Sequence, residues 1–273
     1  MNNAGLHPKK ALAQHFLVSS GILRRIVNAA ELTPQDLVVE VGPGLGVLTD
    51  ALAQQARQVV AVELDRELAE TLVTRYEANP KVRIIHGDAR TVPLDDLVSP
   101  GTPYKVVANL PYYAATPIVR RFLEAAHRPV LLVVTVQREV ARRMVALPGD
   151  MSLLGVGIQV YGRAKIVAAI PPGAFRPPPA VTSAVVRIDP HAEPAVDAEN
   201  AEGFFAMVRA GFSAPRKQLQ GALSHALDRP AAEVGALLES VGVDPTRRAE
   251  TLSVDEWRRL YQADEARKAA SHD

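Results

Sequence analysis

The distribution of hydrophobic positions along the chain predicts an α/β protein. From Leu37 onward, short runs rich in Val and Ile alternate with amphipathic stretches of helical period. The runs that predict buried parallel strands are Leu37–Val41, Val59–Glu63, Val82–Ile85, Lys105–Ala108 and Val130–Val136. The helices predicted between them are Val47–Gln55, Glu67–Glu77 and Pro117–Ala126. Such alternation is typical of a sheet with helices on both faces.

The two ends of the chain follow other patterns. Up to about Gln35 the sequence predicts a basic arm and then a helix that begins after Ser19. Strands are also expected at Lys165–Ile170 and Val181–Ile188; the loop between them has a length that permits a hairpin-like return, so one strand is expected to run antiparallel. The helices expected after a linker at Pro190–Asp197 are Ala201–Phe212, Lys217–Leu227, Ala231–Val241 and Val254–Gln262. We therefore predict a sheet domain at 1–189, which includes the arm, and a small all-α domain at 190–273.

Composition narrows the class of protein. The 273 residues are 48% hydrophobic and 22% charged, as in globular proteins, and they include no cysteine, which excludes disulfides and thiolate metal sites. The first ten residues lack an apolar signal core, and the longest apolar runs are too short to span a bilayer. We expect a cytoplasmic protein without a metal, and nothing in the sequence demands more than a monomer.

The charge is unevenly distributed. The net charge is only +1, but residues 1–190 hold 21 Lys and Arg against 16 Asp and Glu, whereas residues 191–273 hold 10 against 14. The basic excess lies on the part of the chain that carries the motifs described next, which leaves an RNA partner open without establishing one.

A glycine-rich turn follows the first predicted strand, in the order Gly42-Pro43-Gly44-Leu45-Gly46. Glycine allows a ligand to approach the main chain closely, so we expect a small-molecule site at the carboxyl end of this strand. The spacing differs from the G-x-G-x-x-G of dinucleotide folds and is similar to motif I of class I methyltransferases. Glu63 ends the second strand, where a carboxylate can accept hydrogen bonds from both ribose hydroxyls of an adenosine. Asp88 follows the third strand, where a carboxylate can accept from an adenine amine.

The tetrapeptide Asn109-Leu110-Pro111-Tyr112 follows the fourth predicted strand. The lone pair of an adenine N6 amine is delocalised into the ring. If the Asn109 amide oxygen and the Leu110 carbonyl accept its two N–H groups, the nitrogen becomes pyramidal and its lone pair can point at a sulfonium methyl. Pro111 stiffens the loop, and Tyr112 offers a ring on which a flipped base can stack. Phe175, in the Pro-rich loop before the last strand, is a candidate for a second stacking face.

These motifs together resemble those of the ribosomal RNA adenine N6,N6-dimethyltransferases, in particular the bacterial small-subunit (16S), kasugamycin-resistance branch. The segments that carry the resemblance are Lys9–Leu17, Glu40–Gly44, Glu63–Asp65, Gly87–Ala89, Asn109–Tyr112 and Pro177–Val186. The resemblance implies the Rossmann-like, seven-stranded sheet of class I methyltransferases with a helical C-terminal domain that binds RNA. It implies S-adenosylmethionine as cofactor, with S-adenosylhomocysteine as product. It also implies transfer of four methyl groups to two adjacent adenosines in the 3′-terminal hairpin loop of 16S rRNA, in a late small-subunit (30S) precursor.

Carried over to this sequence, the resemblance also assigns individual residues. The implied cofactor contacts are His15, Leu17, Gly42, Gly44, Glu63, Asp88 and Asn109, and the implied base contacts are Asn109, Leu110, Pro111, Tyr112 and Phe175. The arm departs from the family pattern Gly-Gln-Asn-Phe-Leu because Ala13 and His15 stand at its first and third positions. A histidine can make some of the hydrogen bonds of an asparagine, but not all of them.

Basic residues suggest where RNA would bind. Arg138, Arg142 and Arg143 fall near one face of a helix after the fifth strand, and Arg216 and Lys217 open a predicted C-terminal helix; Lys10 lies in the arm. Contacts with phosphates would make RNA affinity strongly dependent on salt.

Three other functions stay open on the sequence. An erythromycin-resistance-type methyltransferase of 23S rRNA shares the tetrapeptide, although the C-terminal Ser213–Lys217 segment favours the small-subunit enzyme. A non-catalytic RNA-binding or assembly factor could keep the same fold, although intact Glu63, Asp88 and Asn109 disfavour it. The glycine spacing also disfavours a nicotinamide dehydrogenase.

Overall fold

The computed structural model describes residues 15–270, and its contacts divide the chain into two compact units. Of the described residues, one unit comprises residues 15–142 together with Ala164–Pro190, and the other comprises Arg143–Arg163 together with residues 191–270. The segment Arg143–Arg163 therefore packs with the C-terminal helices. The predicted division into a sheet domain at 1–189 and a helical domain at 190–273 with separate functions stays a prediction.

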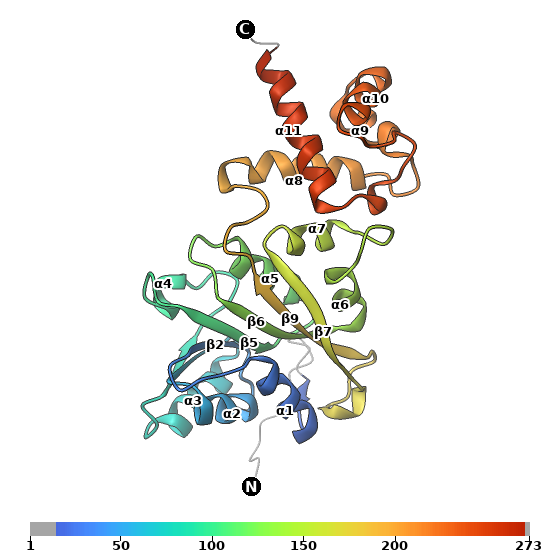
Figure 1. Ribbon diagram of the computed structural model, residues 1–273. Helices are drawn as coiled ribbons and strands as arrows, with labels where there is room; N and C mark the ends of the chain where they lie inside the picture. Colours follow the sequence, from blue (N-terminus) through green and yellow to red (C-terminus); the bar gives the residue numbers. More distant parts are fainter. Residues whose placement is uncertain (1–14, 271–273) are drawn as a thin grey trace. The chain divides into compact units, whose positions relative to one another are not determined.

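The first unit is built on a seven-stranded sheet (Figure 1). Its strands, in sequence order, are β2 (Leu37–Val41), β3 (Gln58–Glu63), β4 (Val82–His86), β5 (Tyr104–Asn109), β6 (Leu131–Gln137), β7 (Gly162–Ile170) and β9 (Ser183–Pro190). They lie side by side in the order β4-β3-β2-β5-β6-β9-β7. Strands β2 to β6 pair in parallel, and β9 pairs antiparallel with β6. The predicted sheet and its antiparallel last strand are confirmed.

Helices cover both faces of this sheet. They are α1 (Ser20–Ala29), α2 (Val47–Gln55), α3 (Arg66–Tyr76), α4 (Leu94–Leu97), α5 (Ala115–Glu124) and α6 (Arg138–Met144), the last of which crosses the boundary between the units. In Figure 1, α1, α2 and α3 lie on one side of the sheet, and α5 and α6 on the other. Helix α1 begins where the sequence predicts, since the Ser19 side chain accepts a hydrogen bond from the Ile22 amide.

A short sheet that the hydrophobic pattern did not predict fixes the start of the described chain. Strand β1 (Phe16–Leu17) pairs antiparallel with β8 (Phe175–Arg176), which follows the 3-10 helix Pro172–Ala174. Leu17 and Phe175 are buried in one hydrophobic cluster with Ile22 and Ile26 of α1. Two residues are too few to show a periodic pattern, so this pairing became visible only in three dimensions.

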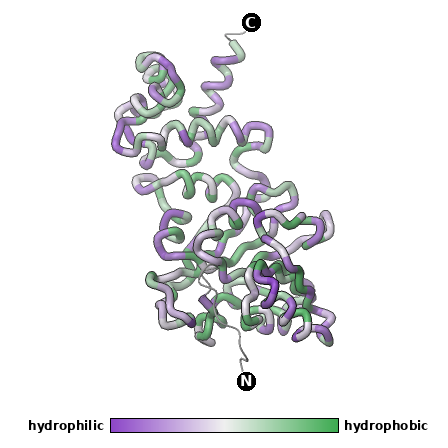
Figure 2. The backbone as a smooth tube through the Cα atoms, turned by 180° about the vertical axis from the view of Figure 1, so that it is seen from behind, coloured by the Kyte–Doolittle hydropathy of each residue, from purple (hydrophilic) through white to green (hydrophobic). Residues whose placement is uncertain are grey.

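The second unit is helical. Its helices are α7 (Leu153–Gln159), α8 (Ala198–Phe212), α9 (Leu219–Leu227), α10 (Ala231–Ser240) and α11 (Val254–Ala270), with a 3-10 helix at Ala249–Thr251. Trp257 is fully buried against α8, and Gly211 is the residue of α8 that makes room for its ring. The end of α11 is exposed; in Figure 2 its tip next to the C label is green, and the turn below the tip is largely hydrophilic. Within residues 15–270, no helix is long and apolar enough to cross a membrane.

The contact between Gly211 and Trp257 predicts a local loss of stability in Gly211→Ala. A Cβ at this position would lie 2.3 Å from the Trp257 ring, so the ring must move, and we expect a loss of about 1–3 kcal/mol. Gly221→Ala in α9 is the control because no atom lies within 4 Å of its Cβ position, and alanine favours a helix. Thermal unfolding followed by circular dichroism compares the two variants. Equal midpoints would contradict this account of the packing.

Candidate active site at the carboxyl edge of the sheet

The parallel register brings the predicted motifs to one edge of the sheet. Val41, the last residue of β2, pairs with Val62 on one side and Ala108 on the other. The next residues of the three strands, Gly42, Glu63 and Asn109, therefore lie in neighbouring positions. Glu63 pairs in turn with His86, two residues before Asp88. Carboxyl ends of parallel strands are where α/β proteins bind ligands.

A cavity at this edge is lined by all of the proposed cofactor and base residues. These are His15, Leu17, Gly42, Gly44, Glu63, Asp88, Asn109, Leu110, Pro111, Tyr112 and Phe175. The sheet and its two flanking loops thus bring together residues that lie up to 160 positions apart in the sequence. Their individual roles stay proposals.

The turn after β2 requires glycine. Gly42, Gly44 and Gly46 have φ angles of +70°, +58° and +78°, which L side chains rarely adopt. A Cβ on Gly44 would also lie 3.0 Å from the Phe16 ring. The turn thus presents bare main chain to the cavity, so a ligand can approach it closely.

Glu63 is a buried carboxylate held by main-chain amides. Its Oε2 accepts from Gly44 N at 3.0 Å, and its Oε1 accepts from Asp65 N at 2.9 Å. Burial raises the pKa of Glu63, while these amides act in the opposite direction. Each oxygen of a carboxylate has a second acceptor position. Glu63 can therefore hold the glycine turn and still accept two hydroxyl groups, which fits the ribose of an adenosine cofactor.

Asp88 is paired with Arg90, a residue that the motifs did not single out. The Arg90 guanidinium contacts both carboxylate oxygens, with Nη2 2.6 Å from Oδ2, and Arg90 also lines the cavity. This hydrogen bond is the main reason that the pKa of Asp88 is lowered. The only signal in the sequence that could have indicated this ion pair is the spacing: Arg90 stands two positions after Asp88 in a loop at a strand end.

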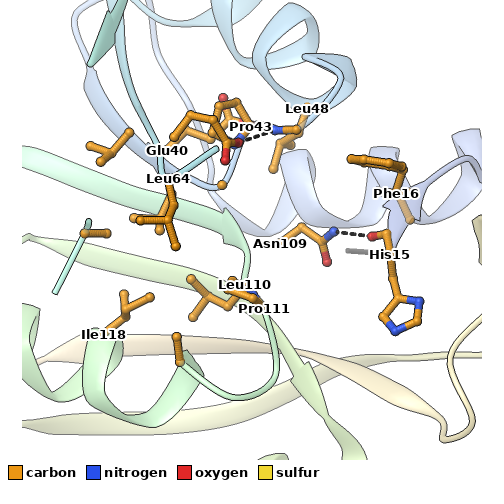
Figure 3. A pocket seen from close by; sticks show the side chains of 18 of the residues that line it. His15, Phe16, Glu40, Pro43, Leu48, Leu64, Asn109, Leu110, Pro111 and Ile118 are labelled. Carbon is orange, nitrogen blue, oxygen red and sulfur yellow. Dashed lines mark hydrogen bonds between the residues drawn. The ribbon is translucent and has the colours of Figure 1, made fainter. Parts of the chain in front are cut away.

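The tetrapeptide is tied to the arm. Asn109 Nδ2 donates to the His15 carbonyl at 3.2 Å, and Figure 3 shows Asn109 between Pro43 on one side and Leu110 and Pro111 on the other. The His15 imidazole points away from Asn109 in this view. Since Nδ2 is committed to the arm, the amide oxygen Oδ1 is the atom of Asn109 that can accept a ligand's hydrogen.

The Tyr112 ring is fixed on two sides. Its hydroxyl shares a hydrogen bond of 2.6 Å with the buried Ser183 at the start of β9. The His15 ring stacks on it with centroids 5.6 Å apart, and His15 Nδ1 donates to the Pro177 carbonyl at 2.8 Å. Neither Ser183 nor the stacking by His15 was expected from the sequence. Phe175, the candidate for a second stacking face, lies two residues before Pro177. Its side chain is only 1% exposed and belongs largely to the core.

The proposed RNA contacts are exposed residues of both units. Arg138, Arg142 and Arg143 are exposed on α6. Arg216 and Lys217 are exposed in the turn before α9, which begins at Leu219 and not at Lys217 as expected. Lys10 lies outside the described residues. Within residues 15–270, no cluster of three His, Asp or Glu side chains is arranged to hold a metal ion.

The fold and this edge define a class I S-adenosylmethionine-dependent methyltransferase. The parallel sheet with one inserted antiparallel strand gives the fold, and the glycine turn, Glu63 and Asp88 fit an adenosine. Among solved structures, the 23S rRNA methyltransferase ErmE is 30% identical, with a TM-score of 0.72 over 91% of this chain and 98% of that one. A dimethyladenosine transferase from Plasmodium falciparum is 24% identical and has the same fold, with a TM-score of 0.76 over 90% and 96% of the two chains.

Sequence comparison identifies the family. The model of the family described as ribosomal RNA adenine dimethylase matches residues 5–264. Two relatives named ribosomal RNA small subunit methyltransferase A come from Dehalococcoides mccartyi (46% identical, over 95% of this chain and 89% of the relative) and Pelotomaculum thermopropionicum (42%, over 94% and 91%). The chain belongs to the ribosomal RNA adenine dimethylase family and is an rRNA adenine dimethyltransferase, as the motifs predicted.

Glu40, beneath the glycine turn, generates a prediction about pH. The side chain is 0% exposed, and neither of its oxygens has a hydrogen-bond partner among residues 15–270. Burial, with Glu63 and Asp50 nearby, raises the pKa of Glu40 to about 8 from 4.5. The folded chain therefore keeps a proton that the unfolded chain releases, and stability falls as the pH rises from about 4.5 to 8.

Glu40→Gln should remove this dependence. The variant is expected to melt several degrees above the parent protein at pH 8 and close to it at pH 4.5, as measured by thermal unfolding across this range. Glu77→Gln, at an exposed position, is the control and should follow the parent throughout. Parallel curves for Glu40→Gln and the parent would show that Glu40 is ionised in the folded protein.

Proposed function

We propose that this enzyme dimethylates N6 of two adjacent adenosines in the 3′-terminal hairpin loop of 16S rRNA, four methyl groups in all, in a late small-subunit precursor. The proposal is supported by the small-subunit name of the relatives at 42–46% identity, which match most of both chains. In this proposal the enzyme acts as a monomer in the cytoplasm, where ribosomal precursors are assembled. The observation that carries the chemistry is the position of Asn109 at the wall of the cavity, with its amide nitrogen committed to His15.

The chain's own residues position the adenine amine. S-adenosylmethionine supplies an electrophilic methyl group on a sulfonium, and the glycine turn, Glu63 and Asp88 are the residues that would hold it. Asn109 Oδ1 and the Leu110 carbonyl accept the two N–H groups of N6, so the nitrogen lone pair is directed out of the ring plane. No strong base is required because the nitrogen loses its proton readily once it is alkylated. A neutral amide also avoids placing a full negative charge against a cationic methyl donor.

Tyr112 supports the base by stacking. The 5.6 Å between the His15 and Tyr112 centroids leaves no room for a base between these two rings. The base therefore stacks on the other face of Tyr112, while His15 and Ser183 keep that ring in place. Phe175 and Leu17 contribute to the wall of the same cavity. Stacking on an aromatic ring contributes roughly 1–3 kcal/mol per base.

RNA would be held by the basic side chains outside the cavity. Arg138, Arg142 and Arg143 on α6 and Arg216 and Lys217 before α9 are exposed, and with Lys10 of the arm they are our candidates for phosphate contacts. The helical domain at 190–273 would contribute to RNA binding through Arg216 and Lys217. A structured hairpin is recognised mainly by shape and backbone, with its loop bases splayed out.

Asn109→Ala tests the chemical role. Loss of a hydrogen-bond acceptor that acts on the reacting group should lower kcat by about 10²–10³-fold, and the affinity for S-adenosylhomocysteine should change far less. Methyl transfer to small-subunit precursors and calorimetric titration measure the two quantities. Because Asn109 also holds the arm, Asn109→Asp is a useful comparison: it keeps an acceptor but cannot donate to His15. Near-normal turnover in Asn109→Ala would refute the proposed role.

The substrate is tested by offering both ribosomal RNAs. A 23S rRNA substrate is the alternative, and the 30% identity with ErmE gives it a specific basis. Labelled methyl transfer to a small-subunit precursor and to 23S rRNA should label only the former, with dimethylated adenosines detected by mass spectrometry. Label in 23S rRNA would favour the alternative substrate. Tight RNA binding without any transfer would favour a non-catalytic assembly factor.

A further inference from the structure

Both oxygens of the Asp88 carboxylate already accept hydrogen bonds from Arg90. Oδ1 accepts from the Arg90 main-chain N at 2.8 Å and from Arg90 Nε at 3.0 Å. Oδ2 lies 2.6 Å from Nη2 and 3.0 Å from Nε, so the single Nε hydrogen is shared between the two oxygens. These three hydrogens take most of the roughly four acceptor positions of a carboxylate, and the Arg90 side chain contacts both oxygens. An adenine amine directed at Asp88 therefore needs an oxygen that the Arg90 side chain uses.

The Arg90 side chain can leave without disturbing the loop. It is 46% exposed, whereas the Asp88 side chain is 24% exposed, so Arg90 is the more solvent-accessible member of the pair. Ion pairs this exposed are weak. The loop itself is held from α5, because Arg121 donates to the carbonyls of Ala89 and Val92. The Arg121 charge also acts on Asp88, so the carboxylate keeps a cationic neighbour when Arg90 moves.

We propose that the Arg90 guanidinium competes with the adenine amine of the cofactor for Asp88, so that cofactor binding displaces Arg90 to the cavity mouth, where it contributes to RNA binding. The proposal rests on the role proposed above for Asp88 in cofactor binding. It makes Arg90 a positioning residue whose presence weakens cofactor affinity, although the side chain lines the cofactor cavity.

The cavity mouth offers a use for the displaced guanidinium. Tyr113 lines the same cavity and is 50% exposed, so its ring is accessible to a ligand that extends beyond the cavity. An exposed aromatic ring beside a mobile guanidinium suits a nucleotide that flanks the target base, because the ring stacks and the cation contacts phosphate. Each ligand would then strengthen the binding of the other, since coupling between two sites is reciprocal.

Calorimetric titration with S-adenosylhomocysteine tests the competition. This probe carries no net charge, so removal of a cation does not by itself favour its binding. Arg90→Ala should bind it about twofold to fivefold more tightly than the parent, as expected for loss of one exposed ion pair. The control is Arg120→Ala, which removes a comparably exposed arginine (43%) that pairs with Glu124 and does not line the cavity. Unchanged or weaker binding by Arg90→Ala would overturn the proposal.

Asp88→Ala separates this inference from the proposed function. If Asp88 binds the adenine, Asp88→Ala should weaken affinity for the probe, and adding Arg90→Ala to it should then change nothing further. If Asp88→Ala leaves affinity unchanged, the role proposed for Asp88 fails, and the competition fails with it. If Asp88→Ala weakens affinity but Arg90→Ala alone does not tighten it, only the competition is wrong. Thermal unfolding of each variant checks that the sheet unit is intact.

The second part of the proposal is that the displaced Arg90 guanidinium contributes to RNA binding. Binding of an RNA hairpin with two adjacent loop adenosines tests it. In the parent protein, saturating S-adenosylhomocysteine should lower the Kd for this RNA, measured by fluorescence anisotropy. In Arg90→Ala this gain should disappear, and with the probe bound the slope of log Kd against log salt concentration should be smaller than the parent's by about one. An equal gain in both proteins would show that the displaced guanidinium does not contact the RNA.

Discussion

The hydrogen bond from the Gly44 amide to the buried Glu63 carboxylate is the constraint on which the site depends. It joins the turn after β2 to the end of β3, and the second oxygen of Glu63 holds the Asp65 amide at the start of α3. Burying a carboxylate is costly unless it is hydrogen-bonded, so the charge and the turn stabilise each other. Gly44 has a positive φ that residues with a side chain rarely adopt, so the turn that makes this contact requires glycine.

The other half of the site is held by contacts that are distant in sequence. Strand β1 pairs with β8, His15 Nδ1 donates to the Pro177 carbonyl, and the His15 carbonyl accepts from Asn109. Ser183, at the start of the antiparallel strand β9, holds the Tyr112 hydroxyl. The inserted strand thus has a local consequence: its first residue fixes the ring on which the base is proposed to stack. In this chain His15 replaces an asparagine of the family pattern, yet its main-chain carbonyl still holds Asn109, a contact that does not depend on the side chain.

The sequence predicted the strands and the position of the site better than the loop contacts that hold the site residues in place. Residues 59–62 of β3 are apolar and buried at every position, and a strand buried on both faces is readable as a continuous apolar segment. The convergence of Gly42, Glu63 and Asn109 followed from one rule about the carboxyl ends of parallel strands. The β1–β8 pairing, the Ser183 contact and the pairing of Arg90 with Asp88 follow no periodic pattern. They depend on which loops meet after folding, so local sequence contains little information about them.

Three carboxylates in one cavity pose an electrostatic problem that the chain solves in three ways. Glu40 has no geometric hydrogen bond among residues 15–270, and its burial outweighs the opposing effect of the Thr49 hydroxyl and raises its pKa to about 8. Glu63 is held by main-chain amides, which lack a full charge and cannot leave. Asp88 alone is covered by a side chain, and that side chain is half exposed. Because only the third arrangement is reversible, Asp88 is the place where ligand binding and the charge at the cavity mouth can be coupled.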